Sequence, residues 1–315
     1  MNTLWLVIPC YNEKEVLPET SSRLKELMTK LIDNGKISNN SKIAFVNDGS
    51  KDNTWQIISD LHKSSSLFTG ISLSRNRGHQ NALLAGLTVA VNYADAVISL
   101  DADLQDDVDT IERFVDEWHN GNDIVYGVRS ARKTDTFFKR FTAEGFYKMM
   151  KKMGVEIVFN HADYRLMTKR ALEGLLKFDE VNLFLRGIVP QIGYKSSIVT
   201  YERHERFAGE SKYPLSKMLK LAINGITSFS FKPLRISLWL GGLSFLISLF
   251  MLVWCIVSAC MGNAAPIWAS VGISVWLACS FILFMLGVIG EYIGNIYMET
   301  KHRPKFIIDT VLIDD

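Results

Sequence analysis

Residues 96–107 read Ala-Val-Ile-Ser-Leu-Asp-Ala-Asp-Leu-Gln-Asp-Asp, an apolar run that leads directly into four carboxylates. Asp101 and Asp103 alternate along an extended chain, so both side chains can point the same way. Hard divalent cations take oxygen ligands, and Mg²⁺ is often held by one or two carboxylates together with substrate phosphates. The same residues could form a solvated turn in which Asp107 or Asp109 caps the next helix. The position after a predicted strand favours a ligand site.

On either side of this stretch, short β-prone runs alternate with helical patterns. Such alternation predicts a mostly parallel sheet covered by helices on both faces, with ligands bound beyond the carboxyl ends of the strands. Pro9 is expected to end the first strand. We expect strands at 3–8, 42–46, 69–73, 96–100 and 123–126, and helices at 16–32, 52–62, 79–93 and 109–120.

Three further polar clusters follow predicted strands. They are Cys10-Tyr11-Asn12-Glu13, Asn47-Asp48-Gly49-Ser50 and the run 75–82. Taken one at a time, each is typical of a turn or a helix cap. Four such clusters after four successive strands instead predict one binding crevice, because the carboxyl ends of parallel strands meet at the same edge of a sheet.

An uncharged segment of 55 residues, 236–290, predicts two transmembrane helices at 236–261 and 267–290. Lysines and arginines flank the pair at its outer ends and none lies in the turn, which places both termini in the cytoplasm. A buried hairpin of a soluble core is disfavoured, because soluble helices rarely stay uncharged for so long. Apolar residues at helical spacing over 214–231 predict a helix at the membrane surface, or else an amphipathic helix packed on the domain.

The overall composition excludes several other classes of protein. The 315 residues include 35 basic and 33 acidic side chains, a net charge of +2, which is not the basic footprint of a nucleic-acid-binding protein. The four cysteines contain no Cys-x-x-Cys pair, so neither a disulfide framework nor a zinc site is expected. Because the charged residues concentrate before residue 236, the chain is neither wholly soluble nor wholly embedded in a membrane.

Taken together, these motifs resemble family 2 of the inverting glycosyltransferases, which have the GT-A fold. Within that family the chain is similar to the polyprenyl-phosphate sugar transferases, of the bactoprenol glucosyltransferase and dolichyl-phosphate mannose synthase type. The resemblance covers essentially the whole chain, and the two-span C-terminus matches the bactoprenol type. It is carried by Pro9–Glu13, Asn47–Ser50 and Asp101–Gln105, with supporting runs at 75–86, 163–167, 184–187, 206–213 and 290–297.

The resemblance implies roles on the donor side of the site. Asp48 is expected to bind the base, which by resemblance is uracil. Asp101 and Asp103 are expected beside the donor diphosphate, and Asp101, Asp103 and Gln105 are the expected ligands of Mg²⁺ or Mn²⁺. Many relatives have Asp-Asp where this chain has Asn47-Asp48, so Asn47 receives no role. The expected nucleotide-sugar pocket consists of Pro9, Tyr11, Glu13, Asp48 and Ala102.

The acceptor side is expected to present arginines and one carboxylate. Arginine suits an acceptor phosphate because its planar fork makes two hydrogen bonds. Arg129, which follows a predicted strand, and Arg140 are the leading candidates. Asp163 lies where the family has an acidic residue near the reaction centre, so it acts as a base, orients the acceptor, or pairs with Arg165 or another arginine. Other candidates for the phosphate are Arg206, Arg132 and Lys139.

The implied reaction transfers one sugar, with inversion, from a nucleotide sugar (UDP-glucose or UDP-N-acetylglucosamine by resemblance) to undecaprenyl or another polyprenyl phosphate, for cell-envelope glycosylation. A phosphate acceptor is already anionic and needs a strong base less than a hydroxyl does. The alternatives are a processive polysaccharide synthase, whose Gln-x-x-Arg-Trp motif is lacking here, a hydroxyl acceptor, and an inactive scaffold.

These expectations divide the chain into four parts. They are a cytoplasmic GT-A domain at 1–210, a juxtamembrane amphipathic helix at 211–235, the transmembrane hairpin at 236–290 and a cytoplasmic tail at 291–315. The expected partners are the nucleotide sugar, the polyprenyl phosphate and the lipid bilayer of the plasma membrane, with no nucleic acid. The resemblance also implies a homo-oligomer, because members of the family can be tetramers.

Overall fold

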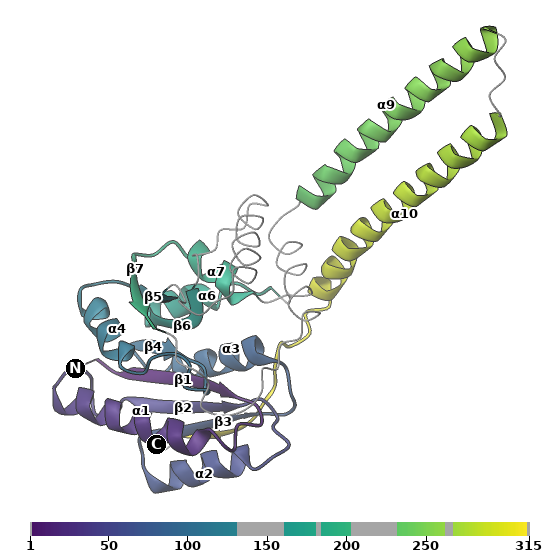
Figure 1. Ribbon diagram of the computed structural model, residues 1–315. Helices are drawn as coiled ribbons and strands as arrows, with labels where there is room; N and C mark the ends of the chain where they lie inside the picture. Colours follow the sequence, from purple (N-terminus) through teal and green to yellow (C-terminus); the bar gives the residue numbers. More distant parts are fainter. Residues whose placement is uncertain (1, 131–160, 181–183, 203–231, 262–266, 314–315) are drawn as a thin grey trace. The chain divides into compact units, whose positions relative to one another are not determined.

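The computed structural model describes residues 2–130, 161–180, 184–202, 232–261 and 267–313 and divides into two compact units (Figure 1). The first unit contains the described residues up to 202 together with 303–313, and the second contains those from 232 to 302. The chain therefore leaves the first unit, builds the second, and returns to complete the first.

The first unit alternates strands and helices much as the sequence predicts. Its first half contains β1 (Leu4–Cys10), α1 (Leu17–Asp33), β2 (Lys42–Asn47), α2 (Thr54–Ser64), β3 (Phe68–Leu73), α3 (His79–Ala90) and β4 (Ala96–Ser99). Its second half contains α4 (Thr110–His119), β5 (Ile124–Arg129), β6 (His161–Thr168), α6 (Lys169–Leu175), α7 (Leu185–Gln191), β7 (Ser196–Tyr201) and β8 (Ile308–Leu312).

The described strands form one sheet in the order β7-β5-β6-β4-β1-β2-β3-β8. The strands β3, β2, β1 and β4 are mutually parallel, and β5 is parallel to β7. Among the described strands, only β6 and β8 run antiparallel to their neighbours. The prediction of a mostly parallel sheet is confirmed. The strand order reverses at β1, which lies between β2 and β4, and such a reversal is where a ligand crevice opens.

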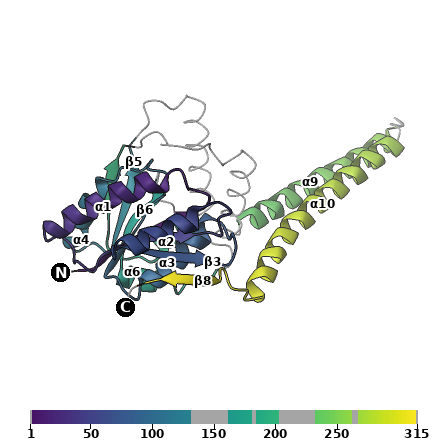
Figure 2. The same cartoon turned by 90° about the horizontal axis from the view of Figure 1, so that it is seen from below.

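Helices cover both faces of this sheet (Figures 1 and 2). On one face, α1 buries Leu17, Leu24 and Met28 completely, at the spacing of an amphipathic helix, against a core that includes Leu6 of β1. On the other face, α3 approaches the sheet through Gly86. A Cβ there would lie 2.4 Å from Val7 Cγ1 and 2.7 Å from Val46 Cγ2, so only glycine permits this packing.

The strand β1 continues past Pro9, which was expected to end it. Pro9 pairs with Val46 of β2, whereas the pairing with β4 stops at Val7 and Ser99. Beyond Val7, β1 is no longer paired with β4, so no ladder hydrogen bond on that side requires an N–H group from residue 9. A proline is therefore tolerated near the end of the strand.

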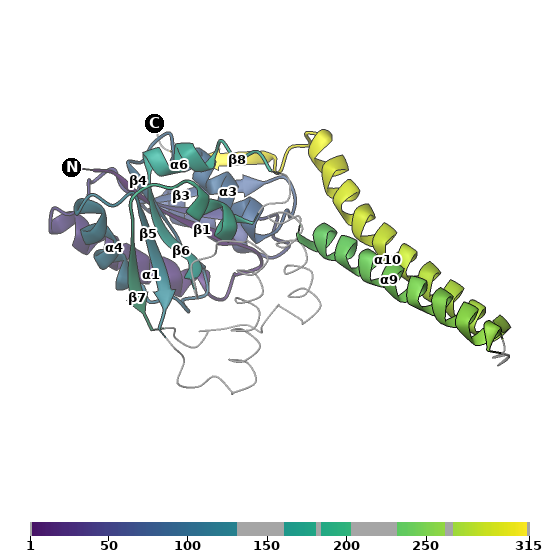
Figure 3. The ribbon, with the colours of Figure 1, turned by 90° about the horizontal axis from the view of Figure 1, so that it is seen from above.

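The strand β8 lies at the edge of the sheet, antiparallel to β3 (Figure 3). The Thr69 hydroxyl donates to the Leu312 carbonyl, and the Ser74 N–H donates to the Ile307 carbonyl at 3.0 Å. Lys305 is also anchored, with Nζ 3.2 Å from the Phe178 carbonyl. The segment 291–315, expected as a tail, thus contains the end of a long helix and an edge strand of the sheet.

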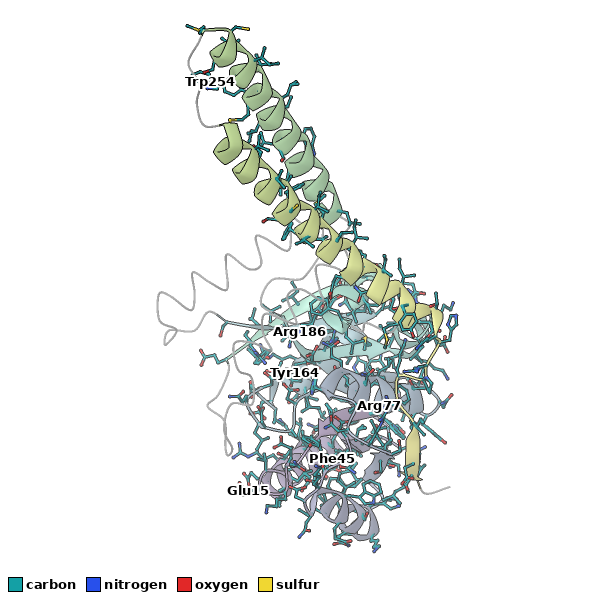
Figure 4. All side chains as sticks on the ribbon, turned by 90° about the vertical axis from the view of Figure 1, so that its right-hand side faces the viewer. Glu15, Phe45, Arg77, Tyr164, Arg186 and Trp254 are labelled. Atoms are coloured by element: carbon teal, nitrogen blue, oxygen red, sulfur yellow. The ribbon has the colours of Figure 1, made fainter. Side chains whose placement is uncertain are left out.

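The second unit contains α9 (Lys232–Cys260) and α10 (Ile267–Thr300), which confirms the two apolar C-terminal helices. Within them, Trp239–Ser258 and Ala278–Thr300 are long and apolar enough to cross a membrane. Trp254 is 64% exposed and its side chain stands out from α9, whereas Phe45 in the first unit is fully buried (Figure 4). The predicted surface helix at 214–231 lies outside the described residues.

Candidate active site

The loops after β1 and β2 are joined by hydrogen bonds between backbone and side chains. The Asn12 N–H donates to Ser50 Oγ at 3.0 Å, and the Lys51 N–H donates back to Asn12 Oδ1 at 2.9 Å. The Glu13 N–H donates to Thr54 Oγ1 at 3.0 Å. Asn12 has a φ of +54°, which asparagine tolerates better than most residues. Tyr11 and Glu13 are therefore held on a fixed loop at the end of β1, and their role in a nucleotide pocket stays a prediction.

Asp48 orders the loop that leads into α3. Its side chain is buried, and its two carboxylate oxygens accept the backbone N–H groups of Arg77 at 2.6 Å and Gly78 at 2.9 Å. Burial raises the pKa of Asp48, and these two hydrogen bonds oppose the rise. Next to it, Gly49 has a φ of +62°, and a Cβ there would lie 2.6 Å from the Arg75 carbonyl carbon. Asp48 is therefore engaged with backbone, and its predicted contact with the base stays a prediction.

The acidic segment after β4 forms a turn fixed to its surroundings. The Ala102 carbonyl accepts from Thr20 Oγ1 at 2.8 Å, and the Ala102 side chain is buried. Asp103 Oδ1 accepts the Gln105 N–H at 3.1 Å, across Leu104 with a φ of +56°. This turn places Asp101 and Asp103 at the carboxyl end of β4, next to the reversal point at β1.

Asp163 of β6 is bound by two arginines. Arg165 Nη2 lies 2.7 Å from Asp163 Oδ1, and Arg186 of α7 approaches both carboxylate oxygens, with Nη2 3.0 Å from Oδ2 and Nε 3.3 Å from Oδ1. Burial alone would raise the pKa of Asp163, but the guanidinium groups of Arg186 and Arg165 outweigh it and hold the pKa far below its usual range. The sequence left three roles open for Asp163, and the structure shows its pairing with arginine.

Asp101 has the opposite environment. Desolvation by the surrounding protein raises its pKa to about 6, although 34% of its side chain is open to solvent. The charge of His79 opposes that rise, and the carboxylates of Asp106, Asp163 and Asp103 add to it. Crowded carboxylates of this kind repel one another, and a bound cation relieves the repulsion.

The donor set after β4 fits a hard divalent cation. Asp101, Asp103 and Gln105 offer carboxylate and amide oxygens, and burial together with the neighbouring carboxylates raises the pKa of Asp101. The described part of the chain contains no cluster of three His, Cys, Asp or Glu side chains poised around a metal ion. An ion held by one or two carboxylates and completed by substrate phosphates and water needs no such cluster.

The predicted acceptor arginines divide into one that the structure describes and two that it does not. Arg129, the last residue of β5, contacts Asp106 and Tyr201 through its guanidinium group. Asp106 outweighs the effect of burial and keeps the pKa of Arg129 above its usual value. Arg140 and Arg206, like Arg132 and Lys139, lie outside the described residues.

Two residues at the centre of this site had no expected role. His79, the first residue of α3, has Nε2 3.4 Å from Asp101 Oδ1 and 3.8 Å from Asp163 Oδ2. Arg186, labelled in Figure 4, was noted only within a supporting run. Gln80 connects their two helices, because its Oε1 accepts the Leu185 N–H at 3.2 Å. His79 lies within the polar run 75–82 and Arg186 within the run 184–187, and these two runs are the sequence feature that indicates them.

Comparison with known proteins assigns the chain to a family. The family model described as glycosyl transferase family 2 matches residues 5–176. The "Uncharacterized glycosyltransferase YkoT" of Bacillus subtilis (strain 168) is 52% identical over 312 residues, which cover 99% of this chain and 93% of the relative. The "Bactoprenol glucosyl transferase" of Shigella phage SfV is 40% identical over 311 residues, 96% of this chain and 97% of that protein.

Solved structures resemble the chain more distantly. Glucosyl-3-phosphoglycerate synthase from Mycobacterium tuberculosis has a TM-score of 0.44 and 16% sequence identity over 72% of this chain and 76% of that one. The assignment therefore depends on the sequence comparisons, in which both the family model and near full-length relatives agree. The chain belongs to glycosyl transferase family 2.

Proposed function

We propose that this protein transfers one sugar from a nucleotide sugar to a polyprenyl phosphate and so makes a lipid-linked sugar. An oxygen of the acceptor phosphate forms the new bond to the anomeric carbon, and the bond from that carbon to the nucleoside diphosphate breaks. A single displacement of this kind inverts the configuration. The leaving group is the nucleoside diphosphate, and UDP is the expected nucleotide.

The binding of Asp163 by two arginines is the observation that carries this proposal. A hydroxyl acceptor needs a general base whose pKa lies near the working pH. Arg165 and Arg186 instead hold the pKa of Asp163 far below its usual range, which makes it a poor base. A phosphate acceptor has no proton to lose, and the guanidinium groups beside Asp163 favour an anion there.

Relatives support the same acceptor. The similar Shigella phage protein is named a bactoprenol glucosyl transferase, and the similarity extends over 96% of this chain, including both apolar helices. A long polyprenyl chain leaves the bilayer only at great cost, since each buried CH₂ group is worth about 0.8 kcal/mol. An enzyme that uses such an acceptor must work at the membrane surface, where two spans would hold it.

The return of the chain into the first unit supports one arrangement in the membrane. The described residues up to 202 and the strand β8 after α10 belong to the same folded unit, which supports a hairpin whose two ends emerge on one side of the bilayer. The basic residues that flank the hairpin make that side the cytoplasm of a plasma-membrane protein.

On the donor side, Asp101, Asp103 and Gln105 would hold Mg²⁺ or Mn²⁺. An ion held there would oppose the charge that develops on the departing diphosphate. The loops after β1 and β2, fixed to each other by Asn12 and Ser50, would enclose the nucleotide. Asp48 keeps the loop after β3 in place beside them through the N–H groups of Arg77 and Gly78.

The test uses the full-length protein in detergent with undecaprenyl phosphate, Mg²⁺ or Mn²⁺, and a panel of radiolabelled nucleotide sugars. We expect one donor to yield an organic-extractable, acid-labile product. The Asp103→Ala variant should lose at least about 100-fold in rate, whereas Asp60→Ala, whose carboxylate is 60% exposed on α2, should keep wild-type activity.

A matched acceptor separates the alternatives. Undecaprenol has the same lipid chain with a hydroxyl in place of the phosphate, and we expect no product from it. Product from undecaprenol would favour a hydroxyl acceptor and a true base at Asp163. A polymeric product would indicate a processive synthase. No product from any donor, in protein with a cooperative thermal transition, would indicate an inactive scaffold.

A further inference from the structure

Arg129 is held by two buried groups rather than extended into solvent. Its Nε donates to the Tyr201 hydroxyl at 3.1 Å, and its Nη2 donates to Asp106 Oδ1 at 3.1 Å. The Asp106 side chain is only 2% exposed, compared with 20% for Arg129. The guanidinium group therefore lies at the border of the protein interior, with one edge bound inward.

A short hydrogen bond also joins the two partners of Arg129 to each other. The Tyr201 hydroxyl donates to Asp106 Oδ1 at 2.5 Å and accepts from Arg129 Nε at the same time. Burial and the carboxylate of Asp106 raise the pKa of Tyr201, so this hydroxyl keeps its proton. We call Asp106, Arg129 and Tyr201 the arginine clamp.

The arginine clamp joins three parts of the sheet. Asp106 follows β4 in the acidic segment, while Arg129 and Tyr201 are the last residues of β5 and β7 and are paired in register. The Ser130 N–H and hydroxyl both donate to the Tyr201 carbonyl, at 2.8 and 3.0 Å, which fixes the end of β5. The donor-side segment and Arg129 are thus tied to each other by one buried carboxylate.

This fixation has a chemical consequence. An unrestrained arginine loses rotamer freedom when it binds a ligand, whereas a fixed planar fork has already lost it. A preorganised cation also needs no rearrangement as charge passes over it. The carboxylate of Asp101 contributes to the raised pKa of Arg129, so the guanidinium lies within electrostatic reach of the acidic segment's first residue.

We propose that Tyr201 is a positioning residue that, with Asp106, aims Arg129 at the phosphate of the lipid acceptor. This inference rests on the proposed function. Tyr201 touches neither substrate. It acts through Arg129, so its loss should weaken the acceptor's binding and leave the donor's binding and the fold nearly unchanged.

The test compares Tyr201→Phe with Tyr164→Phe in the full-length protein. Tyr164 is a matched control, since it is equally buried, its ring lies 5.3 Å from that of Tyr201, and its hydroxyl donates to the Asp107 carbonyl instead of the clamp. We expect Tyr201→Phe to raise KM for undecaprenyl phosphate about tenfold, the loss expected for one hydrogen bond to a charged group. Its KM for the nucleotide sugar and the Tyr164→Phe constants should stay within about twofold of wild type.

A double-mutant comparison shows whether Tyr201 acts through Arg129. Arg129→Lys keeps the charge but cannot form the fork, so it should raise the acceptor KM by itself. Tyr201→Phe should then add little in the Arg129→Lys background, because the group that it positions is gone. Additive effects of the two changes would overturn the inference.

The remaining outcomes are distinguishable from failure of the proposed function. If wild type forms product and Tyr201→Phe leaves the acceptor KM unchanged, or raises both KM values equally, the positioning role is wrong and the proposed function stands. If wild-type protein forms no product with undecaprenyl phosphate, the proposed function is overturned and this inference with it.

Discussion

Asp101 and Asp163 lie in one site, yet their surroundings have opposite charge. Asp101 follows a run of apolar residues, and burial, together with the neighbouring carboxylates, raises its pKa to about 6. Asp163 has two arginines on its carboxylate and stays ionised at any ordinary pH. His79 lies between them and contacts both.

The difference shows how one edge of a sheet can suit two phosphate groups that are bound in different ways. A surplus of carboxylates attracts a metal ion, which can then bind a diphosphate. A carboxylate neutralised by two guanidinium groups leaves the neighbourhood cationic, which suits an anionic acceptor. Removing an arginine beside Asp163 should therefore lower the stability of the protein, whereas removing the charge of Asp101 should raise it at neutral pH.

The largest effect is expected on the Asp163 side. Arg165 is 1% exposed, and its replacement in Arg165→Met leaves a buried carboxylate with one cation fewer. Breaking a buried ion pair in this way costs about 3–5 kcal/mol, which lowers the thermal midpoint by roughly 10 °C for a domain of this size. Thermal unfolding of the full-length protein measures it.

Arg186→Met is the matched control for this prediction. Arg186 binds the same carboxylate but is 33% exposed, so water replaces much of the lost interaction and the cost should be near 1 kcal/mol or less. The Asp163→Asn change should recover part of the stability lost in Arg165→Met, because the buried charge is removed as well. Equal losses at Arg165 and Arg186 would contradict the contrast between a buried and an open partner.

The acidic side could be predicted from sequence because its residues lie on one strand end. Asp101 and Asp103 directly follow an apolar run, and parallel strands present such ends at a common edge. The same local pattern identified β1 to β5 within a few residues. Pro9 was the exception, since its place in β1 depends on where the neighbouring strand β4 stops pairing.

The sequence allowed the pairing of Asp163 with Arg165, but the second arginine on Asp163 depends on a contact that no local pattern contains. Arg186 reaches Asp163 of β6 from the helix α7, and Arg165 turns into the interior two residues after Asp163. The strand β8 was missed for the same reason. Ile308–Leu312 shows only a five-residue alternation of burial, and its partner β3 lies more than 230 residues earlier in the chain.

A smaller effect, of opposite sign, is expected for Asp101→Asn. The folded pKa of Asp101, about 6, lies above the unfolded value near 3.9, so the folded state holds a proton more firmly between these values. Stability of the metal-free protein should therefore fall as pH rises from about 4 through 6 and then level off. Asp101→Asn lacks this fall and should be about 1 kcal/mol more stable than wild type at pH 7.5, a value reduced for solvent exposure.

The measurement is thermal unfolding in chelator between pH 4.5 and 8. Added Mg²⁺ or Mn²⁺ should raise the midpoint of wild type at pH 7.5 more than that of Asp101→Asn, because a bound ion stabilises the folded state that holds it. Asp60→Asn on the exposed surface of α2 is the control and should follow wild type throughout. A lower midpoint for Asp101→Asn at pH 7.5 in chelator would show that the folded protein does not destabilise the charged form of Asp101.

The smallest effect tests the residue that separates the two environments. The charge of His79 lowers the pKa of Asp101, so His79→Gln removes an opposing influence and lets that pKa rise. In metal-free protein, the pH range over which stability falls should then shift upward. Asp163 should not respond measurably, because its two arginines dominate its pKa and His79 ranks behind both. The double variant Asp101→Asn with His79→Gln isolates the cause, since the shift must vanish when the titrating carboxylate is gone. A shift that persists in the double variant would show that another group causes it and that His79 does not act on the pKa of Asp101.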